Sequence, residues 1–172
     1  STRERIKVNL KRRFWKKRLE QLGTFQSPNT DQKYVYFPLH LQPEASTMVK
    51  APLYMHLPDV IRMVSKSLPM NFELYVKEHP ALYKYKSRSI RYYREISELP
   101  NTTLIHPSVD SHSLIKEAEM VTTVTGTAGL EAALYKKPVI TFGNPNYDKL
   151  SQVYTAEDPA QLAALVSQAI NN

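Results

Sequence analysis

The sequence of 172 residues contains no cysteine, only four glycines and no apolar run that approaches the length of a membrane span. Without cysteine there is no disulfide framework and no thiolate metal site, which is compatible with a reducing compartment. A helix that crosses a bilayer needs roughly 20 apolar residues, and no signal peptide with an apolar centre opens the chain. We therefore expect a soluble, cytoplasmic protein.

Two nucleotide-binding fingerprints are missing as well. No G-x-G-x-x-G turn follows the first expected strand, and no G-x-x-x-x-G-K-[ST] loop occurs anywhere in the chain. These absences argue against dinucleotide oxidoreduction and P-loop hydrolysis. The five histidines are scattered without the spacing of metal ligands, so we expect no metal site.

What the chain does contain is enough apolar material for a core. A hydrophobic fraction of 42%, with 10% aromatic residues, excludes wholesale disorder. Because the chain begins at Ser1 and not at methionine, we expect it to be a piece of something longer. We divide it into a basic amphipathic helix (residues 1–23), a polar linker (residues 24–33) and a compact domain (residues 34–172).

The basic helix supplies the net charge of +7, because the rest of the chain is close to balanced. Its lysines and arginines alternate with apolar residues, which is typical of an amphipathic helix. Three interpretations stay open: a solvated helix or inter-domain connector, a contact with an anionic surface at the inner face of the cytoplasmic membrane, and a nucleic-acid arm. No recognition fold or aromatic stacking pattern supports the third, so we expect no nucleic-acid partner.

Strand-like and helix-like segments alternate from residue 34 to the end. This alternation predicts an α/β, Rossmann-like fold, a mostly parallel sheet with helices on both faces, because parallel neighbours need a crossover helix. The expected strands are residues 34–39, 72–77, 102–106, 120–125, 139–142 and 152–155, and the expected helices are residues 58–67, 89–99, 111–118, 130–135 and 158–170.

The most informative stretch is MVTTVTGTAGLEAALYKKPVITFG, residues 120–143. Its pattern indicates a strand, a turn bracketed by Gly126 and Gly129, a helix and a further strand. A strand that turns through glycine into a helix leaves free backbone N–H groups at the positive helix end, and such a point favours phosphate. The alternative is that the two glycines only allow a tight turn and close helix packing.

Polar residues follow the ends of the expected strands, and in a parallel α/β sheet the ligand site lies beyond these carboxyl ends. Hydroxyl and N–H donors suit phosphate oxygens, and the carboxylate of Glu131, one turn into its helix, suits ribose hydroxyls. This edge therefore predicts a nucleotide site. For His79 and Glu131 the alternatives are a packed strand end and a solvated helix residue. The residues expected along the edge are His40, Gln42, Glu44, His79, His106, Ser108, Gly126, Thr127, Gly143 and Asn144.

Four segments, in this order along the chain, carry a resemblance to a known family. FPLHLQPEAST, ELYVKEHP, LIHPSVDSHSLIKEAE and VTGTAGLEAALYKKPVITFG resemble the capsule polysaccharide biosynthesis family over residues 34–154. That family groups with GT-B glycosyltransferases that use CMP-activated acidic sugars, notably 3-deoxy-manno-octulosonate (Kdo) transferases, and shares a His-Pro feature with bacterial sialyltransferases. A GT-B enzyme has two Rossmann-like halves, and the resemblance implies that this chain is the carboxy-terminal, nucleotide-binding half.

The resemblance also implies roles for individual residues. The family's K-x-H-P motif, which lies against the nucleotide and its phosphate, is matched by Lys77, His79 and Pro80, with His79 as the catalytic candidate. The glutamine motif after the first strand matches at Gln42, but the aspartate that some members carry downstream is replaced by Glu44 and then serine. The turn that would hold the phosphate is formed by Thr125, Gly126 and Thr127.

The implied function is transfer of a sugar from CMP-Kdo, or a similar CMP-sugar, to a glycan or glycolipid acceptor of a capsule or other surface polysaccharide. The acceptor and the catalytic base would belong to an amino-terminal domain outside this chain, so we expect the chain alone to be inactive. The nucleotide sugar is a substrate, and no further cofactor is implied. The alternatives are a nucleotide-sugar epimerase or hydrolase on the same fold, and a non-catalytic nucleotide-binding module.

Overall fold

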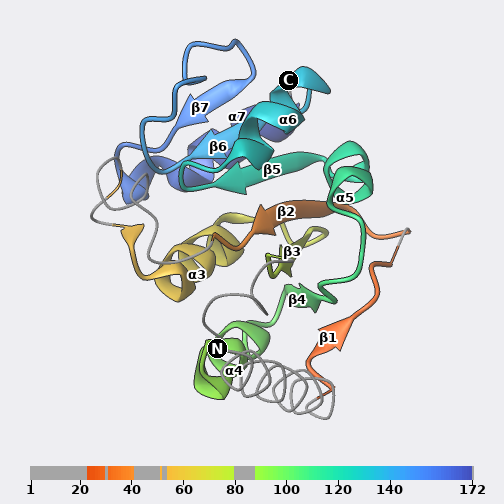
Figure 1. Ribbon diagram of the computed structural model, residues 1–172. Coiled ribbons are helices and arrows are strands. Elements are labelled where there is room, and N and C mark those ends of the chain that lie inside the picture. The colour runs from red at the N-terminus through yellow and green to blue at the C-terminus, as the bar shows by residue number, and fades with distance from the viewer. Residues whose placement is uncertain (1–22, 30, 41–50, 52–53, 80–87, 172) are drawn as a thin grey trace, which may run out of the picture.

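The computed structural model describes residues 23–29, 31–40, 51, 54–79 and 88–171 (Figure 1). These residues form a sheet with the strand order β1-β4-β3-β2-β5-β6-β7, in which every neighbouring pair is parallel. The prediction of a Rossmann-like parallel sheet is confirmed. The strands are β1 (Phe25–Gln26), β2 (Tyr34–Pro38), β3 (Glu73–Lys77), β4 (Thr102–Ile105), β5 (Met120–Thr123), β6 (Val139–Thr141) and β7 (Val153–Thr155).

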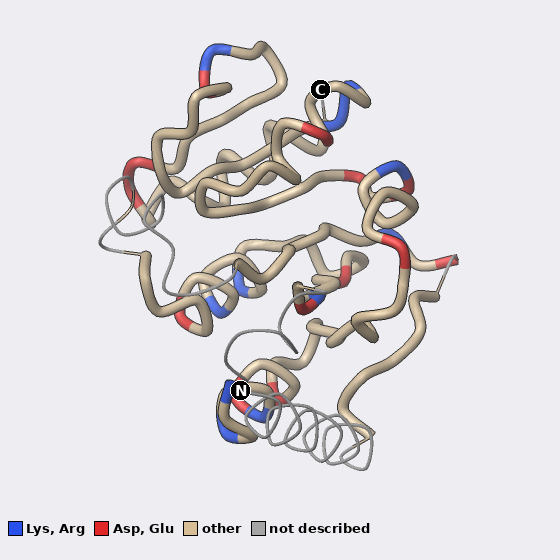
Figure 2. Tube along the Cα trace, viewed as in Figure 1, with Lys and Arg blue, Asp and Glu red and all other residues tan. Residues whose placement is uncertain are grey.

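Helices cover both faces of the sheet because side chains alternate along each strand. Val35 and Phe37 of β2 join a core with residues of α3, α4 and α7, whereas Tyr34 and Tyr36 join a second core with residues of α5 and α6. Strands β2 and β5 carry no charged residue, and the charges gather mainly on helices and loops (Figure 2). The helices are α3 (Leu57–Ser67), α4 (Ile90–Ser97), α5 (Ser111–Glu117), α6 (Thr127–Leu134) and α7 (Leu162–Asn171), with a 3-10 turn at Pro159–Gln161 before α7.

Two local expectations differ from the structure. The expected linker contributes β1, in which Phe25 and Gln26 pair with β4. The Phe25 ring packs edge-on against Tyr93, with 5.5 Å between the ring centroids. The expectation that the late helix begins at residue 130 is wrong, because α6 begins at Thr127 with Gly126 as its N-cap. Gly129 therefore lies inside the first helical turn and does not close a separate turn.

Some predictions lie outside the described residues. The basic helix predicted for residues 1–23 is described only at Gly23, and Gln42, Glu44 and Pro80 fall in undescribed segments. Within the part of the chain that the structure describes, no helix is long and apolar enough to cross a bilayer.

Candidate functional site

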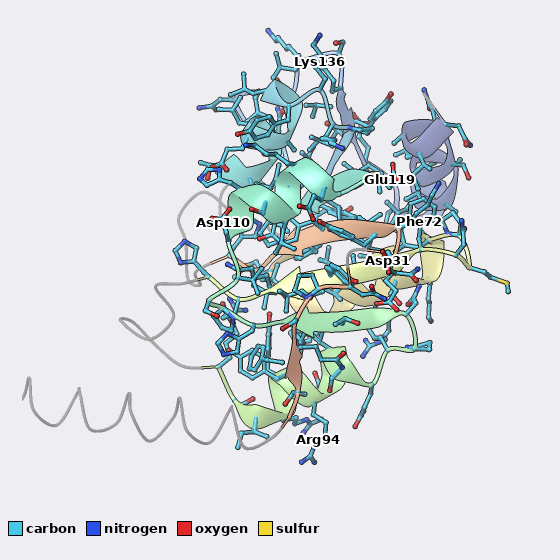
Figure 3. The ribbon with its side chains drawn as sticks, turned by 90° about the vertical axis from the view of Figure 1, so that its right-hand side faces the viewer. Asp31, Phe72, Arg94, Asp110, Glu119 and Lys136 are labelled. Carbon is cyan, nitrogen blue, oxygen red and sulfur yellow. The ribbon has the colours of Figure 1, made fainter. Side chains whose placement is uncertain are left out.

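The order of the strands changes direction between β2 and β5. From β2 the chain builds β3 and β4 on one side, and it then returns to place β5, β6 and β7 on the other side. Ligands of such sheets bind at this switch point, beyond the carboxyl ends of the strands. Figure 3 shows Asp110, the N-cap of α5, at that edge, with Asp31, Phe72 and Glu119 at the opposite, amino edge.

His40, two residues after the end of β2, is fixed against the end of β5. Its Nε2 accepts a hydrogen bond from the Val124 N–H at 3.2 Å and lies 3.0 Å from the Thr123 hydroxyl oxygen. The same hydroxyl oxygen accepts the Gly126 N–H at 3.2 Å, so its own proton points to His40. Burial, followed by the positive charge of Arg88 and the nearby His79, lowers the pKa of His40 to about 4. At neutral pH the ring is therefore uncharged and carries its proton on Nδ1.

Gly126 is required by the packing around His40. A Cβ at this position would overlap the His40 ring at Cε1 and would lie 2.9 Å from the Thr123 hydroxyl oxygen. The backbone at Gly126 has φ −76°, so close approach explains this glycine and backbone conformation does not. Close packing against His40 thus accounts for this glycine, and whether the turn also holds a phosphate stays a prediction.

The first turn of α6 offers backbone donors at the switch point. The N–H groups of Thr127 and Ala128 have no hydrogen-bond partner among the described residues, and no side chain caps this helix. The Thr127 residue is exposed. By contrast, the Thr125 hydroxyl is fully buried and has no partner within the described chain, so it does not reach the surface as a donor.

Tyr147, in the loop after β6, covers the side of this turn. Its hydroxyl donates to the Gly126 carbonyl, and its ring lies 3.0 Å from where a Cβ on Gly129 would sit. Burial raises the pKa of Tyr147, so the phenol stays protonated. The role of this residue is not visible in the sequence, because an aromatic side chain in a loop carries no signal of what it contacts.

His79 follows β3 and is exposed at the same edge. Its backbone N–H donates to Oε1 of Glu78 at 2.8 Å. Glu78 is completely buried and lies 3.0 Å from Nε of Arg88, whose guanidinium also donates to the carbonyl of His40. Burial raises the pKa of Glu78, while Arg88 and the hydroxyl of Tyr93 act against that rise.

Lys77 is not an open phosphate donor. Its side chain is buried, and Nζ donates to the hydroxyl of Ser111 at the start of α5 at 2.9 Å. Burial lowers the pKa of Lys77, and the nearby carboxylates of Asp110 and Glu78 oppose that change. Lys77 therefore links the end of β3 to the start of α5.

The remaining predicted residues lie to either side of the switch point. Ser108 follows β4 and is exposed. Its hydroxyl oxygen lies 2.6 Å from Nδ1 of His106. Glu131, on the second turn of α6, lies 3.3 Å from Nδ1 of His112 on α5. His40 thus packs against the start of α6, and His79 follows β3 at the same edge of the sheet. Ser108 follows β4, which is two strands from β2.

A cavity of about 540 Å³ opens beyond β6 and β7, next to the Tyr147 loop. This volume falls within the usual range of small-molecule sites. Among the described residues, no group of three or more histidines or carboxylates could hold a metal ion. The cavity is lined by Tyr54, Phe142, Gly143, Asn144, Asp148, Lys149, Thr155, Ala156 and Glu157.

We predict that His40 makes stability depend on pH. Its folded pKa of about 4 lies below the unfolded value of roughly 6.5, so the unfolded chain binds the proton between these values. The free energy of unfolding should rise through this window by up to about 1.4 kcal/mol per pH unit. Urea unfolding from pH 4 to 7 measures this slope.

The control for that experiment is His40→Gln, whose side-chain oxygen can accept the Val124 N–H without titrating. Glu78 titrates in the opposite direction but is present in both proteins, as are Arg88 and His79. Equal pH slopes in the two proteins would show that His40 does not titrate as its burial requires.

The parallel sheet, the switch in strand order and the helices on both faces define a Rossmann-like α/β domain. The chain belongs to the capsule polysaccharide biosynthesis protein family, whose family model matches residues 5–154. The resemblance predicted from the four segments is confirmed. No match was found among the curated proteins.

Three solved structures show the same fold. The β-Kdo 2,7-transferase KpsC of Thermosulfurimonas dismutans is 21% identical, with a TM-score of 0.59 over 84% of this chain and 46% of that chain. The UDP-GlcNAc 2-epimerase of Methanocaldococcus jannaschii is 16% identical, with a TM-score of 0.62 over 84% of this chain and 40% of that one. Anabaena HepE, solved with UDP-glucose, is 18% identical, with a TM-score of 0.55 over 90% of this chain and 42% of that chain. The chain thus spans less than half the length of each.

Proposed function

We propose that this chain is the nucleotide-sugar-binding, carboxy-terminal half of a GT-B glycosyltransferase that builds a capsule or other surface polysaccharide. Membership of the capsule polysaccharide biosynthesis family supports the class of reaction. The observation that carries the proposal is the contact of His40 with Gly126 at the switch point, where the Thr127 and Ala128 N–H groups have no hydrogen-bond partner among the described residues. Backbone donors at a helix start are suited to a phosphate.

In this proposal the donor phosphate rests on the start of α6. Transfer passes through an oxocarbenium-like centre as the CMP phosphate leaves, so the protein must stabilise charge that develops on phosphate oxygens. The backbone N–H groups of Thr127 and Ala128 would supply fixed donors, and the side chain of His79 would supply a further donor from the end of β3, which β2 separates from β5. Glu131 would approach the ribose from the second turn of α6.

The sugar of the donor would occupy the cavity beyond β6. Asn144 and Thr155 offer neutral hydrogen-bonding groups, and Tyr54 offers an aromatic ring. Lys149 is the cation among the residues that line this cavity, which also include the carboxylates of Asp148 and Glu157, and it would pair with the carboxylate of an acidic sugar such as Kdo. The acceptor would come from another domain, and the isolated chain would transfer no sugar because it lacks the proximity of an acceptor surface.

We predict that CMP binds this chain more tightly than UMP, UDP or NAD. The reason is the joint presence of the His-Pro strand end and the glycine-bounded start of α6, a combination that resembles CMP-sugar enzymes. Isothermal calorimetry with the four nucleotides tests this order. Equal or stronger binding of UDP would move the assignment to a uridine-sugar enzyme, either a transferase or an epimerase of the kind that shares the fold.

We also propose that the basic residues 1–23 contact an acidic lipid surface. Each basic group near such a surface contributes on the order of 1 kcal/mol at moderate salt. Anionic vesicles should therefore sediment the intact chain at low salt and should not retain a chain that lacks these residues. Equal sedimentation of the two forms would favour the connector interpretation.

A further inference from the structure

The buried ion pair between Glu78 and Arg88 joins the backbones of the two histidines at the proposed site. We propose that these two residues are positioning residues, which set the spacing between His40 and His79 and thereby the affinity for nucleotide. This inference rests on the proposed function for its readout, although the contacts themselves do not depend on it.

The carboxylate of Glu78 is fully engaged. Its Oε1 accepts the N–H of His79 at 2.8 Å, and its Oε2 accepts the hydroxyl of Tyr93 at 2.8 Å and lies 3.0 Å from Nε of Arg88. The side chain has no solvent exposure. A carboxylate that is buried and satisfied in this way holds one geometry, because each bond constrains the same planar group.

Arg88 provides the other half of the connection. Its guanidinium donates to the carbonyl of His40 and to the hydroxyl of Tyr92, and it stacks 4.7 Å from the Tyr92 ring centroid. The side chain is 11% exposed. Five donors in a rigid plane allow one arginine to reach Glu78, His40 and Tyr92 together, which the point charge of a lysine cannot do.

The position of the pair in the chain explains what it constrains. Glu78 directly follows β3 and precedes His79, whereas Arg88 lies directly before the N-cap of α4. His40 lies just beyond the end of β2, the strand next to β3. The pair therefore ties together two strand ends and one helix start, and two of these three points carry a histidine of the proposed site.

Stability alone does not account for such a pair. Removing two charges from water offsets most of their attraction, so replacement of a whole buried pair by neutral groups is often close to neutral for stability. Removal of one partner is different, because it leaves an uncompensated buried charge. A variant that neutralises both residues should therefore keep the fold while it loses the geometric connection.

The test compares the double variant Glu78→Gln with Arg88→Met against the matched control Glu95→Gln with Arg91→Met. The control pair lies on α4, with 2.9 Å between its charged atoms and Arg91 87% exposed. Calorimetry with CMP, thermal unfolding and hydrogen exchange of the His79 amide are measured for both. We expect at least a tenfold loss of CMP affinity and faster exchange in the first variant, with little change in Tm, and no change in the control.

A third variant, Arg88→Lys, separates geometry from charge. We expect it to lose at least fivefold in CMP affinity although it keeps the positive charge beside Glu78. Full affinity in this variant, or unchanged affinity in the double variant, overturns the proposal. So does a fall in Tm that parallels the loss of affinity, because the pair would then act on the fold as a whole.

The exchange experiment keeps this inference distinct from the proposed function. If the wild-type chain binds none of the nucleotides, the proposed function fails. Hydrogen exchange of the His79 amide, measured without nucleotide, then decides whether the ion pair fixes the two strand ends. Faster exchange in the double variant at unchanged Tm retains the pair as the element that fixes the two strand ends, and unchanged exchange rejects it.

Discussion

Gly126→Ala should reduce CMP affinity at least tenfold and lower the free energy of unfolding by about 1–3 kcal/mol, the usual cost of overpacking. The added methyl group would overlap the ring of His40 and approach the Thr123 hydroxyl oxygen to 2.9 Å. His40 cannot move aside without losing the hydrogen bond from Val124. Displacement of His40 also moves the start of α6, where we place the phosphate.

The matched control is Gly129→Ala, three residues further along the same helix turn. Its added methyl meets the far end of the Tyr147 side chain, which can rotate away. Alanine in place of glycine inside a helix gains up to about 1 kcal/mol, which offsets the lost contact of Tyr147 with Gly126. Calorimetry and urea unfolding of both variants measure the contrast. Equal losses of CMP affinity and of stability at the two positions would show that the packing of Gly126 against His40 is no tighter than that of Gly129 against Tyr147.

The regular alternation of the sequence was sufficient to predict the fold. Buried parallel strands are short, β-branched and aromatic, and the segments before Leu39, Glu78 and His106 show that composition clearly. Because parallel strands place their carboxyl ends at one edge, the sequence also predicted that His40, His79 and Gly126 would lie along the same edge of the sheet. Strand β1 was missed, since a strand of two residues is too short for any periodic signal.

The parts of the site that depend on long-range pairing were not visible in the sequence. Arg88 reaches His40 across 48 positions, and Tyr147 reaches Gly126 across 21. Neither residue stands out from its neighbours in the chain. The two glycines were interpreted as a pair bracketing one turn, whereas each is small for a separate reason, one against a buried imidazole and the other against a tyrosine ring. Only the fold distinguishes these reasons.

His79→Ala should weaken CMP binding ten- to a hundred-fold while the thermal stability of the unliganded chain stays nearly unchanged. Loss of one hydrogen bond to a charged group costs about 1.5–3 kcal/mol, which corresponds to that range of affinity. The residue is exposed, and it donates a hydrogen bond to Glu78 from its backbone N–H, which alanine keeps. Binding and stability should therefore separate at this position.

Thr127→Ala should cost less than His79→Ala, because the backbone donors at the start of α6 remain when the hydroxyl is removed. The control is His56→Ala, which removes another exposed imidazole, one that pairs with Asp59 on α3, and should leave CMP affinity unchanged. Calorimetry and thermal unfolding of the three variants complete the comparison. If His79→Ala binds CMP like the wild type, or if its stability falls in step with its affinity, His79 is a packed strand end. The phosphate would then have to be held by the start of α6 without it.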